Sequence, residues 1–425
     1  MGEQDKRAVT EALQPEKRLK NTFRFTDTDQ DLMNFHRGRD MINMAVAAVL
    51  FAGYSLTFLV PKFYGATDKY VGVFVFFCCM VLFFNNLNLR QIIRKKDREF
   101  IFVSALLTLC LVNLIIVRSG FGAFFVASDF ILIFYLSAYI SFNEKYLYIM
   151  AGLYMLLLLY WFVIAYPKLF SDFAYYGYNT NTAATFTIYT LLCALLLLEL
   201  LKEKKPAGIL RKYPEIPGFF MTLLLIKGLQ LSFWHRARGA FVMLIMFLLF
   251  KFVLKKTLWY RKGFYKAVWV FATLGSLLFV ALYILVSFTG VNFKLPFFYK
   301  SVFSGRELIW REFFELFVKK PLTGIGTNAV IESFFEFNVH NAMYNFLVIH
   351  GIVVFAGILI LVFKRAGYFY GIIRRSGISL CALIVLLSVF IESFFDVDLI
   401  WADYSLNLLF LLIFINSGKA ENGEV

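Results

Sequence analysis

The stretch that decides the fold is residues 100–117, FIFVSALLTLCLVNLIIV, an apolar run without a charged residue. A helix needs roughly 20 mostly apolar residues to cross the hydrocarbon core of a bilayer. The run belongs to a chain of 425 residues, of which 60% are hydrophobic and 17% charged, whereas soluble domains carry about 25% charged residues. A single soluble core stops growing at about 250–300 residues. The composition therefore excludes a soluble or disordered protein and predicts a membrane protein.

Comparable apolar runs recur along the chain and predict an all-α, polytopic membrane protein with about twelve transmembrane helices. The expected spans are Met41–Pro61, Val71–Leu87, Phe100–Val117, Phe121–Phe142, Tyr146–Tyr166, Ala183–Leu201, Phe219–Trp234, Gly239–Leu254, Ala267–Phe288, Ala342–Phe363, Ile378–Phe395 and Leu399–Asn416. They divide the chain into an N-terminal tail (1–40), nine spans (41–288), a long connection (289–341), three further spans (342–416) and a C-terminal tail (417–425).

The basic residues predict the orientation of these spans. Most of the 43 Lys and Arg residues lie in the N-terminal tail and in the even-numbered connections. Since cytoplasmic segments close to the spans carry the excess of Lys and Arg, both termini are expected in the cytoplasm and the long connection on the outer face. The net charge of +15 is then an orientation signal, and no nucleic-acid partner is expected.

Two further features of the sequence limit the class of protein. The N-terminal tail contains no apolar stretch resembling a signal peptide. All five cysteines fall within expected spans, so neither a disulfide framework nor a thiolate metal site is predicted.

The long connection, residues 289–341, is the candidate functional segment. Loops longer than about 12–15 residues usually have a function or are disordered, and the many aromatic residues of this one argue for folded structure. Ser304 and Glu307 have the spacing of a capping box that begins a helix. An apolar stripe follows at helical spacing, formed by Trp310, Phe313, Phe314 and Phe317.

Arg306 lies in the first turn of this expected helix. A helix start presents unpaired N–H groups and the positive end of the helix dipole, and a guanidinium beside it makes a strong site for an anion such as phosphate. The alternative is an interfacial helix whose arginine contacts lipid headgroups, and the two interpretations stay open on these residues alone.

Two glycines and a histidine follow before the tenth span. Gly324 and Gly326 predict a turn and little more. His340 precedes the expected helix start, where the dipole disfavours imidazolium and leaves a neutral ring available as a base. A purely structural role at the helix end is the alternative.

The order of these residues resembles the O-antigen ligase and Wzy-type polysaccharide polymerase superfamily, bacterial inner-membrane glycosyltransferases with a GT-C-like helical fold. The resemblance rests on Ser304-Gly305-Arg306, Trp310, Phe317, Pro321-Leu322, Gly324, Gly326, His340-Asn341, Tyr344 and Gly351. A second family arginine belongs to a Ser-Arg-Gly-like motif, and the corresponding stretch here, residues 234–240, is WHRARGA. Arg238 fits because Gly239 follows it, but Ala237 replaces the usual serine and Arg236 is a rival. The family also often has an acidic residue where this chain has His350.

The resemblance implies a reaction on a polyprenyl-diphosphate-linked glycan, which is moved to an acceptor hydroxyl on the outer face of the bacterial plasma membrane. It implies that Arg306 and Arg238 hold the diphosphate, that His340 lies near the acceptor, and that no metal, nucleotide sugar or other cofactor takes part. Further substrate contacts are expected from Arg236, Trp310, Asn341 and Tyr344. The partners would be lipid-linked donor and acceptor glycans, the bilayer, and a chain-length regulator and a flippase.

Three functions fit this interpretation to different degrees. A polymerase would join repeat units into capsular polysaccharide or O-antigen, whereas a ligase on the same fold would transfer the finished glycan to a final acceptor. A flippase of lipid-linked units is the third, but a transporter would place its charges along the spans at mid-membrane. The sequence does not separate polymerase from ligase.

A few other charged residues carry weaker expectations. Asp396 and Asp398 have the spacing of a metal and nucleotide-diphosphate site, but their loop is expected outside, away from nucleotide sugars, so a solvated acidic loop is preferred. Asp129 and Glu392 lie near outer span ends and could pair with an outer arginine. Lys227 lies within the seventh span, where a charge is costly and suggests a function, although its partner stays open.

Overall fold

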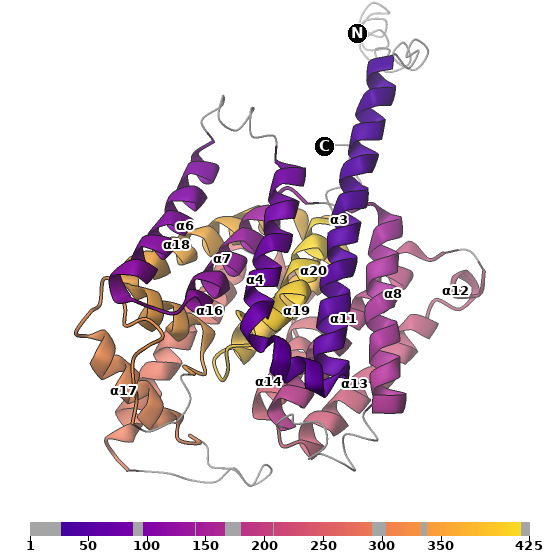
Figure 1. The fold of residues 1–425 in the computed structure, drawn as a ribbon. Coiled ribbons are helices and arrows are strands. Elements are labelled where there is room, and N and C mark those ends of the chain that lie inside the picture. Colours follow the sequence, from indigo (N-terminus) through magenta and orange to yellow (C-terminus); the bar gives the residue numbers. More distant parts are fainter. Residues whose placement is uncertain are drawn as a thin grey trace, which may run out of the picture.

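The structure is a computed structural model, and it describes residues 27–87, 97–140, 142–165, 180–206, 208–290, 303–332 and 338–417. Throughout these ranges the regular structure is helical and no strand occurs (Figure 1). The predicted all-α class is therefore confirmed. Most of the aromatic residues of the long connection lie outside these ranges.

The α-helices, in chain order, are α3 (Asp27–Leu59), α4 (Pro61–Asn86), α6 (Arg98–Val117), α7 (Phe121–Leu136), α8 (Glu144–Tyr160), α11 (Thr180–Lys204), α12 (Ile209–Lys212), α13 (Ile216–Trp234), α14 (Arg238–Leu248), α15 (Lys256–Trp259), α16 (Lys262–Ser287), α17 (Arg306–Phe317), α18 (Ala342–Ile372), α19 (Gly377–Glu392) and α20 (Ser405–Asn416). Short π-helical segments, η1 (Trp161–Ala165) and η2 (Leu249–Val253), extend α8 and α14, and a 3₁₀ turn, η3 (Ala402–Tyr404), precedes α20.

Seven of the described helices are long and apolar enough to cross a membrane. Their spanning portions lie in α3, α6, α8, α11, α13, α16 and α18. Shorter apolar helices of 10–17 residues occur in α4, α7, α19 and η3 with α20. The structure thus supports a membrane protein, whereas the count of twelve spans stays a prediction.

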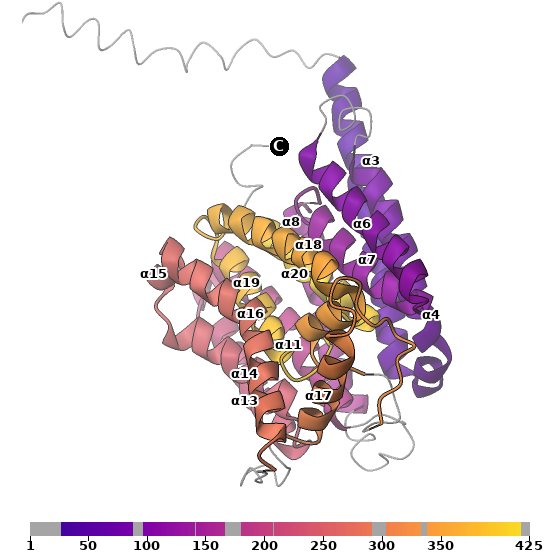
Figure 2. The same ribbon diagram turned by 90° about the vertical axis from the view of Figure 1, so that its left-hand side faces the viewer.

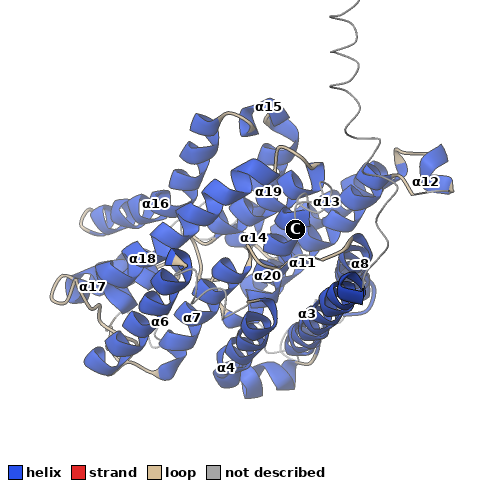
Figure 3. Ribbon diagram, turned by 90° about the horizontal axis from the view of Figure 1, so that it is seen from above, coloured by secondary structure: helices blue, strands red, loops and turns tan. Residues whose placement is uncertain are grey.

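The helices form an interior and an outer layer. In α11, 89% of the apolar span is buried, against 28% in α6 and in α16. All residues of α20, and all of α19 after its first, are buried as well. Seen from above, α11 lies among α8, α13, α14 and α20 (Figure 3). Because α6 and α16 leave most of their apolar residues uncovered by protein, they are among the helices that would face lipid.

The fourth expected span, Phe121–Phe142, is too long, because α7 ends at Leu136. The terminal carbonyls of α7 are taken by a buried guanidinium: Arg365 donates from Nε to the Phe134 carbonyl at 2.7 Å and from Nη2 to the Tyr135 carbonyl at 2.8 Å. The same guanidinium pairs with Glu99. A charge from α18 therefore stabilises the end of α7 in place of a further helical turn.

The tenth expected span, Ala342–Phe363, is not one straight helix. Gly351 has φ 81° and ψ 170°, which breaks α18 into two helical segments. The carbonyls released at the break are satisfied: Ile325 N–H donates to the Val348 carbonyl at 2.8 Å and Gly326 N–H to the Ile349 carbonyl at 3.2 Å. Asn113 Nδ2 donates to the His350 carbonyl at 2.8 Å. A buried break of this kind persists because each freed polar group finds a partner.

The same contacts explain the glycines at 324 and 351. A Cβ atom on Gly324 would lie 2.4 Å from the Ile349 carbonyl oxygen, and one on Gly351 would lie 2.2 Å from the Leu322 carbonyl oxygen. Gly324 also has φ +75°. The segment after α17 therefore lies backbone against backbone on the break in α18, and the glycines do more than form a turn.

Candidate active site

The candidate site lies at the end of the molecule where α17 packs against the end of α16 (Figure 2). Trp310, Phe313 and Phe317 form the buried stripe of α17, but Phe314 is 44% exposed and does not belong to it. The apolar face is thus narrower than expected. It anchors a short amphipathic helix whose first residue, as predicted for its first turn, is Arg306.

The predicted capping box at the start of α17 is wrong. The N-cap is Gly305, with φ 83°, and no side chain caps the helix. Ser304 takes a left-handed conformation with φ 55°, and its hydroxyl accepts a hydrogen bond from Nη2 of Arg238. Ser304 therefore links α17 to the start of α14 instead of capping its own helix.

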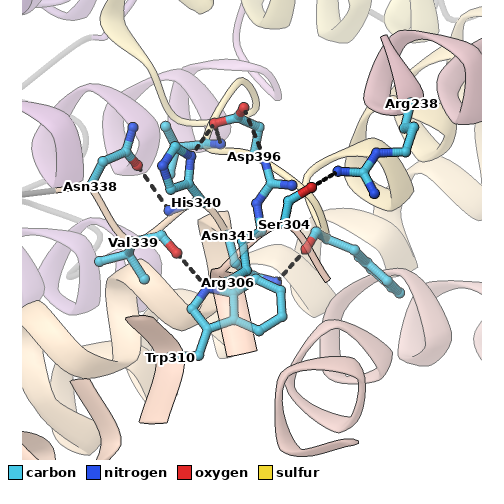
Figure 4. Close-up of polar contacts among 11 residues, drawn as sticks. Arg238, Ser304, Arg306, Trp310, Asn338, Val339, His340, Asn341 and Asp396 are labelled. Atoms are coloured by element: carbon cyan, nitrogen blue, oxygen red, sulfur yellow. Dashed lines mark hydrogen bonds and ion pairs between the residues drawn. The ribbon is translucent and has the colours of Figure 1, made fainter. Parts of the chain in front are cut away.

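Asp396, in the connection between α19 and α20, stands between the two principal predicted site residues (Figure 4). Its Oδ2 lies 3.8 Å from Nη2 of Arg306, and its Oδ1 lies 3.4 Å from Nδ1 of His340. The second distance is long for a hydrogen bond. One carboxylate thus brings together an arginine from α17 and a histidine that precedes α18.

The position of His340 is fixed by its neighbours. Its backbone is left-handed, with φ 51°, and its N–H donates to Oδ1 of Asn338 at 2.8 Å. Next to it, the Asn341 side chain caps α18 by accepting from Tyr344 N–H at 2.9 Å and donates to the Phe394 carbonyl at 3.0 Å. Ser276 of α16 donates to the same Asn341 oxygen at 2.8 Å. The histidine is therefore tied to α16, α18 and the end of α19.

Trp310 and Tyr344 are both buried and serve the same framework. Trp310 donates from Nε1 to the Val339 carbonyl at 2.7 Å, and Tyr344 donates from its hydroxyl to the Trp310 carbonyl at 3.0 Å. With Asn341, they are engaged with protein partners that hold residues 338–341 in place. That these three bind substrate stays a prediction, and their observed contacts favour a positioning role.

The structure distinguishes the two arginines of the α13–α14 turn. Arg238 begins α14 and lines a cleft together with Arg306. Arg236 is exposed in the turn, with φ 54°, and does not line that cleft. Of the two rivals, Arg238 is the one that shares a cleft with Arg306.

The cleft itself is narrow, about 20 Å³, hardly more than one water molecule requires. It is lined by Asn181, Thr185, Ala237, Arg238, Gly239, Ala240, Arg306, Glu392, Phe395 and Asp396. Gly239 permits the close approach of α19 here, since a Cβ atom on it would lie 2.6 Å from Oε1 of Glu392. This close approach explains why the residue after Arg238 is a glycine.

The acidic residues beside the cleft do not form the solvated loop that the sequence suggested. Burial by itself raises the pKa of Asp396, but its hydrogen bond to His340 and the charges of His340 and Arg306 outweigh burial and hold that pKa below its usual value. Asp398 is 5% exposed, and burial together with the charge of Asp396 raises its pKa to about 8. The two aspartates therefore have different charge states near neutral pH.

Asp396 is the site residue whose role was not predicted. The sequence contains a signal, because Asp396 and Asp398 have the spacing of a metal site. The ion pair with Arg306 and His340 could not be read from it, since these residues are separated by tens of positions along the chain. Within the described ranges no group of three or more His, Cys, Asp or Glu side chains is arranged to hold a metal ion.

Other charged residues lie apart from the cleft. Lys227 donates to Oε1 of Gln230 at 3.1 Å and lies over the Trp234 ring at 5.6 Å, and both of these contacts are with its own helix. Asp129 is buried in α7, and no described arginine forms a salt bridge with it. Tyr175, Tyr176 and Tyr178 are aromatic residues for which the sequence predicts either stacking on sugar faces or a place in an interfacial aromatic belt, and they lie outside the described residues.

The site thus consists of two arginines, Arg238 and Arg306, and the pair His340 and Asp396. These residues come from the α13–α14 turn, from the segment between α16 and α18, and from the α19–α20 connection. No protein-family model matches this chain, and no curated protein matches it at a significant level.

Proposed function

We propose that this protein is a GT-C-type membrane glycosyltransferase that polymerises polyprenyl-diphosphate-linked oligosaccharide units into capsular polysaccharide or O-antigen. The reaction would take place on the outer face of the bacterial plasma membrane. The observation that supports it most is the meeting of Arg306, Arg238 and the His340–Asp396 pair at one end of an apolar helical bundle. Such a set combines anion binding with a proton acceptor.

The arginines suit a diphosphate leaving group. Arg306 and Arg238 line the same cleft, and within the described residues the buried Nε of Arg306 has no hydrogen-bond partner. A guanidinium offers several donors in a plane and matches phosphate oxygens in pairs. As the bond between the anomeric carbon and the phosphate oxygen breaks, preorganised donors of this kind stabilise the charge that develops on the diphosphate.

The histidine suits the acceptor. With Nδ1 turned toward Asp396, the His340 ring would carry its proton on Nδ1 and leave Nε2 as the basic nitrogen. Nε2 would take the proton of the acceptor hydroxyl while its oxygen forms the new bond to the anomeric carbon. The lost diphosphate and the transferred proton balance this single displacement.

The narrow cleft implies that substrate binding rearranges side chains. Its volume of about 20 Å³ cannot hold a diphosphate and two sugars. The Arg306–Asp396 contact of 3.8 Å is long enough to be exchanged for a phosphate at small cost. The cleft between the two arginines is therefore too small for the donor, and we expect the diphosphate to widen it by competing with Asp396 for Arg306.

The decisive experiment supplies the purified, full-length protein with lipid-linked repeat units and follows the length of the glycan. A polymerase yields a ladder of longer glycans in the presence of a chelator and without nucleotide sugar. Arg306→Ala and His340→Ala should each abolish the ladder. Arg311→Ala is the matched control, because Arg311 lies on the same helix, 3.5 Å from Glu315, and should retain it.

Other outcomes would replace the proposal. A single transfer of finished glycan to a lipid A core acceptor, without a ladder, would identify the ligase. Movement of lipid-linked units across vesicles without a new glycosidic bond would identify a flippase. Loss of the ladder on chelation, restored by a divalent metal, would contradict the metal-independent mechanism.

A further inference from the structure

A groove of about 480 Å³ lies between the beginning of α16 and the second half of α18. One face of α16 forms its first wall, with Lys262, Tyr265, Lys266, Trp269 and Val270. The second wall comes from α18, with Phe363, Ala366, Gly367 and Tyr370. Since α16 runs from here to α17 (Figure 2), the groove and the candidate active site lie at opposite ends of α16.

The groove is open because two of the four residues on its α18 wall are small. A Cβ atom built on Gly367 meets no other atom within 4 Å, and Ala366 beside it adds only a methyl group. On α16, the residues that line the groove recur at intervals of three and four, which places them on one helix face. The open space is therefore a consequence of helix geometry and side-chain size.

The charged groups that line the groove are two ammonium groups. Both tyrosine hydroxyls are already engaged, since Tyr265 donates to the Ala366 carbonyl at 2.7 Å and Tyr370 donates to the Tyr260 carbonyl at 2.6 Å. Lys262 and Lys266 are exposed and form no salt bridge within the part of the chain that the structure describes. No acidic residue lines the groove.

We propose that this groove binds an anionic phospholipid. The phosphate would lie between Lys262 and Lys266, and the acyl chains would lie along Trp269, Val270 and Phe363. A ligand that suits these walls must be anionic at one end and apolar over the rest. Lysines next to a membrane surface attract anionic headgroups, and the apolar and aromatic side chains that line the rest of the groove suit acyl chains better than a sugar or nucleotide.

The residues around the groove are positively charged, like the two lysines that line it. Lys255 and Lys256 begin α15 just before α16, and Arg374 lies 6.0 Å from the Tyr370 ring. The proposal does not depend on the proposed glycosyltransferase activity, because the groove and the cleft share no residue. It requires only that α16 and α18 lie in a membrane, as their length and composition indicate.

The test is native mass spectrometry of the full-length protein in detergent, titrated with dioleoyl phosphatidylglycerol or dioleoyl phosphatidylcholine. We expect one tightly retained phosphatidylglycerol and weaker binding of phosphatidylcholine. K262Q/K266Q should raise the apparent Kd for phosphatidylglycerol roughly 10- to 30-fold. K255Q/K256Q removes the same charge outside the groove and should raise it less than about 3-fold.

A second pair of variants tests the shape of the groove. Gly367→Leu fills the open space and should abolish the retained lipid. Gly371→Leu, one turn further along α18, also meets no atom within 4 Å but does not line the groove, and it should bind like the wild type. Circular dichroism and gel filtration of each variant establish that it is folded.

Three results would overturn the proposal. Equal binding of both phospholipids would show that the headgroup charge is not recognised. An equal loss in K255Q/K256Q would assign the effect to the general charge of this surface. Displacement of phosphatidylglycerol by inorganic phosphate at the same concentration would show an anion site without a lipid.

Discussion

Arg238 and Arg236 are two positions apart, and their different surroundings lead to a prediction at the scale of single residues. Arg238 bonds to Ser304 and shares a cleft with Arg306, whereas Arg236 is exposed. In the glycan-ladder assay, Arg238→Ala should lower the rate roughly 100-fold or more, as expected for loss of an anion-stabilising donor. Arg236→Ala should stay within about 3-fold of the wild type. The reverse order would show that the cleft does not mark the diphosphate site.

Asp398 leads to a prediction about pH. Its pKa is raised to about 8 by burial and by Asp396, so the folded protein keeps a proton that the unfolded chain releases at its ordinary carboxyl pKa. The stability that this protonated carboxyl contributes is complete below that ordinary pKa and is lost as pH rises through about 8. The apparent Tm should therefore fall by a few degrees between mildly acidic and mildly alkaline pH.

The matched variants for this effect are Asp398→Asn and Glu315→Gln. Asp398→Asn removes this titrating group and should make the fall in thermal unfolding scans smaller. Glu315 is 61% exposed on α17, and Glu315→Gln should keep the wild-type profile. A fall that is unchanged in Asp398→Asn would assign the pH dependence to other groups.

At the scale of elements, the break in α18 is the feature that organises the site. The segment that begins at Ala342 carries His340 and Asn341 at its start, and it ends at Gly351, where the backbone turns. Without the break, the N–H groups of Ile325 and Gly326 would lose the carbonyls that they bond. The position of the connection after α17 therefore depends on this glycine, and the same helical segment carries the histidine at its other end.

Gly351→Ala should destabilise the protein. A Cβ atom at this position would lie 2.2 Å from the Leu322 carbonyl oxygen, on a residue with φ +81°. Backbone strain of this kind costs roughly 1–3 kcal/mol, and the clash adds to it. The loss would appear as a lower apparent Tm in circular dichroism. Gly371→Ala, in open space on the same helix, should be neutral or more stable by up to about 1 kcal/mol. Equal Tm values for the two variants would contradict this account.

At the scale of the whole molecule, the prediction concerns sidedness. The positive-inside distribution predicts that α17 lies outside and the beginning of α16 inside. With all five native cysteines buried, background labelling should be low. A membrane-impermeant maleimide added to intact spheroplasts should label Arg311→Cys, whereas Lys262→Cys should react only after permeabilisation. The opposite pattern would invert the orientation and place the candidate site in the cytoplasm.

The sequence by itself determined the helical membrane class and the approximate extent of most helices. It could do so because apolar side chains and helix length are local properties: residues 100–117 indicate a spanning helix whatever surrounds them. Arg306 could likewise be assigned to a helix start from its neighbours alone. The same local reasoning failed at Ser304. Its hydroxyl accepts a hydrogen bond from Arg238, a residue distant in the sequence, instead of capping α17.

Only the tertiary structure decided which charges meet. Asp396 joins Arg306 and His340 across three connections. Arg238 rather than Arg236 shares a cleft with Arg306 and Asp396. Gly351 breaks a helix that the hydropathy pattern presents as continuous. These outcomes depend on how α14, α17, α18 and α19 pack at one end of the bundle. A sequence pattern records the preference of each segment, whereas an ion pair or a shared cleft depends on distances between segments that are fixed only when the helices pack.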